Sequence, residues 1–188
     1  MARTNNHPRG IRVPPLRRIA IRDQAMKVRE AYGLNQPIVD LAKFVECELS
    51  NSGYVYDIVS GDEMGDDEAQ AFPDSCVLRI REDIYEALIR QDRRARFTIA
   101  HEIGHLALHQ GIPLRWAGTP QNNASRTHAF YEDSEWQADT FAAEFLMPVD
   151  LIRKYCTKAV EISDVFGVSL DAALIRISAL RAERLLPW

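Results

Sequence analysis

The segment that most limits the fold of this chain runs from Arg96 to His105 and contains the pattern His-Glu-x-x-His. Apolar and small residues around it predict one helix from about residue 93 to residue 110. On a helix, residues four apart lie nearly one above the other, so His101 and His105 can direct their imidazoles at one metal ion. Glu102 lies one position round the helix, where its carboxylate can take a proton from water beside the metal. The pattern predicts a metallohydrolase site.

A third metal ligand is expected on a second helix, predicted from Glu132 to Met147. Glu135 is the best candidate, because two histidines and a carboxylate leave the fourth position of a tetrahedral site open to water. Asp139 follows one turn later and is expected to accept a hydrogen bond from the non-metal nitrogen of His101. His109 continues the four-residue spacing, but positions 101 and 109 are ~12 Å apart along a helix axis. We therefore expect His109 to lie outside the ligand set.

Composition narrows the class of protein. The chain has 188 residues, a length that suits one domain with a small appendage. No apolar run approaches the ~20 residues of a membrane helix, and no signal peptide precedes the first predicted helix, so a cytoplasmic protein without a membrane partner is expected. The three cysteines are widely spaced and are expected to be free thiols. The net charge of -4 gives no general reason to expect nucleic-acid binding.

Periodicity predicts an α+β fold with a small antiparallel sheet. Helices are expected at about 16–32, 37–49, 81–91, 93–110 and 132–147, and strands at 54–59 and 76–80. The acidic segment 61–74 is expected to be a solvated loop. The strand at 76–80 could lie along the cleft with an edge free to pair with a peptide, and an ordinary edge strand is the alternative.

We expect three parts: a flexible basic arm at 1–15, a metallopeptidase domain at 16–148, and a helical C-terminal subdomain at 149–188. Six arginines and no acid stand in residues 1–22, a pattern typical of a solvated tail, with contact to DNA or an acidic partner as the alternative. Residues 161–169 resemble the turn of a helix-turn-helix. The helix after it is largely apolar, with Leu170, Ala173, Leu174, Ile177 and Leu180, which favours packing on the core over DNA binding.

The two predicted helices together resemble the ImmA/IrrE family of zinc metallopeptidases. The resemblance rests on the run from Arg96 to His105 and on the run from Glu135 to Pro148, which contains Glu-x-x-Ala-Asp. It implies a zincin-like core, with His101, His105 and Glu135 as ligands and Glu102 as general base. Zn²⁺ is the expected ion, although Mn²⁺ and Fe²⁺ suit the same ligands.

The segment 111–134 departs from the family pattern and could form a lid, with His128 or Tyr131 giving a hydrogen bond to the oxyanion of the reaction. The resemblance implies an endopeptidase that cleaves a helix-turn-helix repressor of the XRE type and so derepresses prophage, mobile-element or stress genes. Two alternatives stay open. One is a metal-stabilised regulatory protein that binds DNA or a repressor without cleavage, and the other is a toxin-antitoxin component whose partner is an antitoxin.

Overall fold

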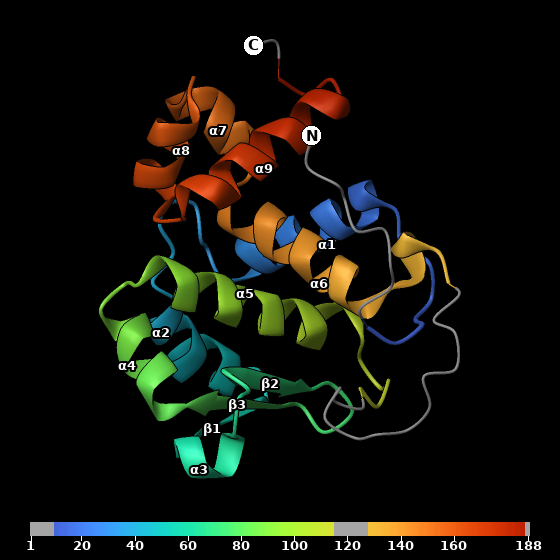
Figure 1. The fold of residues 1–188 in the computed structure, drawn as a ribbon, viewed down its shortest axis with the longest axis vertical. Helices are drawn as coiled ribbons and strands as arrows, with labels where there is room; N and C mark the ends of the chain where they lie inside the picture. Colours follow the sequence, from blue (N-terminus) through green and yellow to red (C-terminus); the bar gives the residue numbers. More distant parts are fainter. Residues whose placement is uncertain (1–9, 115–127, 187–188) are drawn as a thin grey trace.

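A computed structural model describes residues 10–114 and 128–186 of the chain. It contains a small sheet with helix α5 (Arg93–Leu108) lying across it, α1 (Arg18–Ala31) and α6 (Ser134–Leu146) on the other side of α5, and the C-terminal helices beyond them (Figure 1). This arrangement confirms the α+β fold with a helical C-terminal extension. Within the described ranges, no helix combines the length and the apolar run that crossing a bilayer requires.

The sheet has three strands, β1 (Val55–Val59), β2 (Ala69–Phe72) and β3 (Val77–Arg81), in the order β1-β3-β2. β3 pairs parallel to β1 and antiparallel to β2, so the sheet is mixed and the expected purely antiparallel arrangement was wrong. After β1, the chain forms β2 at the other edge of the sheet, running in the opposite direction. It then reverses into β3, which lies between the two and is parallel to β1. As a result β3 is the central strand, and β2 is the edge strand next to α5.

The remaining elements surround this core. In chain order they are α2 (Leu41–Lys43), the π-helical turn η1 (Phe44–Leu49), α3 (Gly61–Met64), α4 (Glu82–Ile89), the 3-10 turn η2 (Phe130–Glu132), α7 (Val149–Tyr155), α8 (Ala159–Phe166) and α9 (Leu170–Ala182). The segment 61–74, expected to be a solvated loop, contains α3 and β2. Two alanines of β2, Ala69 and Ala71, are buried, which explains why a run with so little β propensity pairs with β3.

Buried arginines join the C-terminal helices to the rest of the molecule. Arg176 of α9 donates to Glu144 of α6 at 2.7 Å and 2.5 Å, and both side chains are 0% exposed. Arg96 of α5 donates to the carbonyl of Gly167, in the turn between α8 and α9, at 3.1 Å. The turn that resembles a helix-turn-helix is thus bonded to α5.

The apolar residues of α9 do not all face the core. Ala173, Ile177 and Leu180 are buried as expected, but Leu170 is 44% exposed and Leu174 51%. The helix thus packs on the core, as expected, through Ala173, Ile177 and Leu180, and Arg176 on the same side pairs with Glu144.

Candidate metal centre

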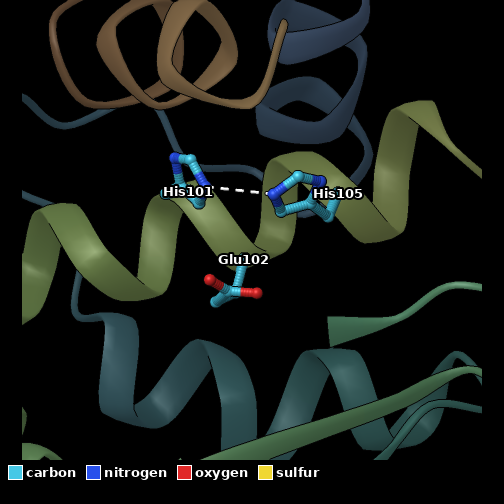
Figure 2. Close-up of side chains that lie close together, drawn as sticks. All are labelled: His101, Glu102 and His105. Carbon is cyan, nitrogen blue, oxygen red and sulfur yellow. Dashed lines mark hydrogen bonds between the residues drawn. The ribbon is translucent and has the colours of Figure 1, made fainter. Parts of the chain in front are cut away.

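Helix α5 presents the two histidines toward each other. Its first turn is capped by Asp92, whose carboxylate accepts from the backbone N–H of Arg94 and Ala95. From this fixed start the helical spacing brings His101 Nε2 to 3.0 Å from His105 Nε2 (Figure 2). His105 is almost completely buried, whereas the side chain of His101 keeps 15% of its surface exposed.

Glu135 of α6 completes a triangle with these nitrogens. One of its oxygens lies 3.2 Å from His101 Nε2 and the other lies 3.4 Å from His105 Nε2. Ligands placed tetrahedrally at ~2.0–2.1 Å from a zinc ion are about 3.3 Å from one another, so the three groups are spaced as a first-row metal requires. The residues fit a divalent cation without rearrangement of the backbone. Glu135 stands in the first turn of α6, where the helix dipole favours its negative charge.

The charges around the triangle also favour a cation. Asp139 Oδ1 lies 2.9 Å from His101 Nδ1, the contact expected for this pair. Burial alone would lower the pKa of His101, but hydrogen bonds with Asp139 and Glu135 outweigh it and raise the pKa to about 10. Burial likewise opposes ionisation of Glu135, yet hydrogen bonds with His101 and His105 hold its pKa well below the usual range. The site therefore holds positive charge strongly, and a divalent ion would take the place of the proton on His101.

Glu102 projects from the same helix toward the strands rather than toward α6 (Figure 2). Its carboxylate accepts a hydrogen bond of 2.7 Å from the backbone N–H of Ala71 in β2. Ligand-capable atoms of His101, Glu102 and His105 all lie within 4.8 Å of one another, and the oxygens of Glu135 lie 3.2 Å and 3.4 Å from the two imidazole Nε2 atoms. Burial raises the pKa of Glu102 to about 8. A buried carboxylate beside the ligands, and not among them, suits a general base.

The contact with Ala71 also identifies the strand that faces the site. The expectation that the strand at 76–80 would offer a free edge was wrong, because β3 is paired on both sides. The edge strands are β1 and β2, and on β2, beside α5, the N–H of Ala71 bonds to Glu102 instead of to a strand. β2 is therefore the strand beside the metal centre.

Close packing of the two helices that carry ligands depends on Gly104. A Cβ built at this position would lie 3.1 Å from two side-chain atoms of Phe141 and 3.2 Å from the Cα of Ala138. Such contacts are tighter than side chains normally make, so a residue larger than glycine would push α6 away from α5. Gly104 thereby sets the distance between Glu135 and the two histidines.

Residues 10–16 form an extended segment along the start of α6, which we call the N-terminal strap. Its backbone N–H groups at Gly10, Val13 and Leu16 donate to Asp133 Oδ2, the carbonyl of Glu132 and the carbonyl of Tyr131. A Cβ at Gly10 would lie 2.1 Å from Ser134 Oγ and 2.8 Å from the backbone nitrogen of Glu135. The expectation of a flexible arm was wrong for this part of it, because paired backbone groups and the buried Val13 fix it in place. The arm's first nine residues lie outside the described residues.

The charges of this N-terminal region are also engaged. Arg12 pairs with Glu132, Arg18 with Glu183, and Arg22 with both Glu144 and Glu183. Arg18 and Arg22 join α1 to Glu183 at the end of α9, and Arg22 also joins it to Glu144 of α6, whereas the side chain of Arg12 is 71% exposed and joins the strap to η2.

Of the two residues expected to contact the oxyanion, His128 is hydrogen-bonded to Asp133 and Tyr131 is exposed. His128 Nε2 lies 3.0 Å from Asp133 Oδ2, and Asp133 also caps α6 through the N–H of Trp136, so His128 supports the start of the ligand helix. Tyr131 is 44% exposed and its ring packs edge-on against Phe130. Trp116, Asn122 and Asn123, expected in the lid, lie outside the described residues.

Two polar residues behind His105 complete the buried part of the site. His105 Nδ1 lies 3.1 Å from His109 Nδ1, and His109 Nε2 lies 3.1 Å from Gln137 Oε1. The ring nitrogens of His109 face His105 and Gln137, so its exclusion from the ligand set stays a prediction. The sequence analysis did not predict a role for Gln137. Its place between Glu135 and Asp139, on the buried face of α6, was the signal that could have identified it.

Comparison with known proteins places this site in a family. The pattern of the family described as IrrE N-terminal-like domain, peptidase family M78, matches residues 84–178. The chain belongs to this family. The matched residues contain α5, α6 and most of the C-terminal helices, so membership covers all three groups of the triangle. The family is one of metallopeptidases.

Among solved structures, the chain is similar to a Mycobacterium tuberculosis transcriptional regulator, with a TM-score of 0.55 and 18% sequence identity. The match covers 88% of this chain and 49% of that one, so this IrrE-like chain spans about half the length of the regulator. The likeness shows a shared fold. No curated protein matches the chain.

Proposed function

We propose that this IrrE-like protein is a metal-dependent endopeptidase. The observation that carries the proposal is the triangle of His101 Nε2, His105 Nε2 and Glu135, with edges of 3.0–3.4 Å, beside a buried carboxylate that is not one of its corners. A divalent ion held there, with zinc the first choice and manganese and iron suiting the same ligands, would polarise a peptide carbonyl and lower the pKa of water.

The residues of the chain supply the rest of the chemistry. Glu102 takes the proton from the attacking water and passes it to the nitrogen of the departing amine, so the peptide C–N bond breaks while a C–O bond forms. Asp139 accepts a hydrogen bond from His101 Nδ1 and would so leave His101 Nε2 to bind the ion. Tyr131 could donate to the oxyanion on the substrate from its exposed position, whereas His128 serves first to hold Asp133.

We propose a helix-turn-helix repressor of the XRE type as the substrate, cleaved in the cytoplasm so that the genes it controls are expressed. An antitoxin of similar fold would be recognised by the same chemistry. The name of the structural neighbour, a transcriptional regulator, supports a role in gene control. We also retain the division into a metallopeptidase domain at 16–148 and a C-terminal subdomain at 149–188, whose exposed apolar side chains suit protein contact better than DNA.

An apolar cavity of about 630 Å³ beside the centre supports a protein substrate. Phe97, Trp136, Asp139 and Ile175 are among its lining residues, and Asp139 is shared with the metal site. We propose that it receives a large apolar side chain near the scissile bond. Ala143→Phe would narrow this cavity, so peptide cleavage should become less efficient while metal content stays unchanged.

The decisive experiment compares wild type with Glu102→Gln. This change preserves size and removes basicity, and loss of a general base typically costs 10²-fold to 10⁴-fold in rate. Each variant would be co-expressed with the helix-turn-helix repressor encoded nearest to its gene, while repressor length and a reporter are followed. Glu86→Gln is the matched control, because Glu86 lies exposed on α4.

We expect wild type and Glu86→Gln to shorten the repressor and switch on the reporter, and Glu102→Gln to do neither. If Glu102→Gln switches on the reporter as well as wild type, with the repressor intact in both, the protein regulates by binding and not by cleavage. Metal content tests the ligands separately. We expect about one ion per chain, lost from His101→Ala and Glu135→Ala.

A further inference from the structure

The orientation of Gln137 is determined by its neighbours. Its Nε2 lies 2.9 Å from the carbonyl oxygen of Pro14, in the N-terminal strap, and 2.8 Å from that of Tyr131. Two carbonyl oxygens can only accept hydrogen bonds, so the two hydrogens of the amide must point at them. The opposite orientation would place three oxygens in contact in a fully buried position. Oε1 of Gln137 therefore faces His109.

The proton positions on both imidazoles follow from this orientation. Because Gln137 Oε1 can only accept, His109 Nε2, 3.1 Å away, carries the hydrogen. His109 is 1% exposed, and in the described part of the chain its ring nitrogens hydrogen-bond with Gln137 and His105 and not with a carboxylate, so burial favours the neutral ring, whose Nδ1 is an acceptor. His105 Nδ1, 3.1 Å from it, must then be the donor. The remaining nitrogen of His105, Nε2, is left with a lone pair directed at His101 and Glu135.

We propose that Gln137 and His109 are positioning residues of the metal centre, which fix His105 in the tautomer that can bind a metal through Nε2. The hydrogen bonds run from the carbonyls of Pro14 and Tyr131, through Gln137 and His109, to His105. This assignment rests on the proposed metal site, and it treats the N-terminal strap as part of that site. His101 obtains the same result from the carboxylate of Asp139. The partly buried His101 is oriented by a charged carboxylate, and the fully buried His105 is oriented by hydrogen bonds to neutral groups.

Two substitutions at His109 separate hydrogen bonding from packing. The Oδ1 of an asparagine occupies about the place of Nδ1 in histidine and can accept from His105 Nδ1–H. A leucine fills similar volume and accepts nothing. We expect His109→Asn to bind Zn²⁺ within about threefold of wild type, and His109→Leu to bind it 10–100-fold more weakly, the usual cost of losing such a partner. Affinity would be measured by competition with a coloured chelator, with folding checked by circular dichroism.

Gln137 is tested by Gln137→Met, which has similar length and no polar group. The proposal expects a loss of Zn²⁺ affinity in this variant too, because His109 can then adopt either tautomer. A purely structural role predicts the reverse order at His109, since leucine suits a buried site better than asparagine. Zn²⁺ binding by His109→Leu that equals or exceeds that of His109→Asn would overturn the proposal.

A spectroscopic measurement on the unsubstituted protein tests the same idea without any variant. In the full chain stripped of metal, nitrogen chemical shifts of the imidazoles distinguish a hydrogen on Nδ1 from one on Nε2. We expect Nδ1–H for His105 and Nε2–H for His109, and Nε2–H on His105 would refute the assignment. Failure of the metal site itself would appear differently, as wild-type protein that binds Zn²⁺ no better than His101→Ala.

Discussion

At the scale of single residues, the metal centre is built from a few side chains whose partners determine their protonation. Asp139 and Glu135 favour positive charge at His101, and burial keeps His109 neutral by lowering its pKa to about 4. The proximity of the proposed ligands and base could be predicted from the sequence, because two helical spacings place them on facing sides of α5 and α6. The partners of Gln137 could not, since they are backbone carbonyls of segments distant in the chain.

The role of Asp139 gives a prediction at this scale. Asp139→Asn removes the negative charge that favours His101 with a hydrogen on Nδ1, while it preserves shape. We expect Zn²⁺ affinity to fall 10–100-fold, which chelator competition would detect. Asp171→Asn is a suitable control, because Asp171 lies in the first turn of α9 and forms no part of the triangle. Equal affinities of the two variants would show that Asp139 is dispensable.

At the scale of helices and strands, the long amphipathic segments were predictable and the short ones were not. α1, α5 and α6 lie within a few residues of their predicted bounds, because each carries several turns of apolar periodicity. β2 was missed because only four residues form it, two of them alanine, and pairing with β3 rather than propensity makes it a strand. This omission affects the site, because the strand that bonds to Glu102 is β2, which the sequence did not predict.

The contact between α5 and α6 yields a second prediction. Gly104→Ala would place a methyl group 3.1 Å from Phe141, so α6 must shift by a few tenths of an ångström and carry Glu135 with it. We expect weaker Zn²⁺ binding and a melting temperature lower by several degrees, as overpacking typically costs 1–3 kcal/mol. The same change at Gly61, where the nearest atom is 3.8 Å away, should alter neither quantity. Calorimetry with and without Zn²⁺ would measure both.

At the scale of the whole molecule, one buried ion pair joins the C-terminal helices to the metallopeptidase core. Glu144 lies on the side of α6 away from the metal, and receives hydrogen bonds from Arg176 and Arg22. Burial opposes its ionisation, but these arginines outweigh burial and lower its pKa from 4.5. A carboxylate whose pKa is lowered by folding stabilises the protein fully when the pH is above its ordinary pKa. This stabilisation is lost as the pH falls through the lowered pKa.

Glu144→Gln should therefore destabilise the protein without removing its metal. Breaking one partner of a buried pair typically costs about 3–5 kcal/mol at neutral pH, and we expect the difference from wild type to shrink as pH falls below about 4.5. Urea unfolding at several pH values would measure it. The exposed pair of Glu86 and Arg90 provides a control, with an expected change within about 0.5 kcal/mol. Loss of zinc from Glu144→Gln, with Glu135→Gln unaffected, would contradict the choice of carboxylate.

The strap along α6 has a consequence for how a newly made chain acquires its metal. Gly10 and its partner Asp133 are 123 residues apart, so at 5–20 residues per second a ribosome needs roughly 6–25 s to make the second after the first. During that interval α5 has emerged with His101 and His105, but neither Glu135 nor the partners of the strap exist. Of the three proposed ligands, the nascent chain then holds only the two imidazoles, so we expect the complete site to form after α6 has been made and the strap has paired with it.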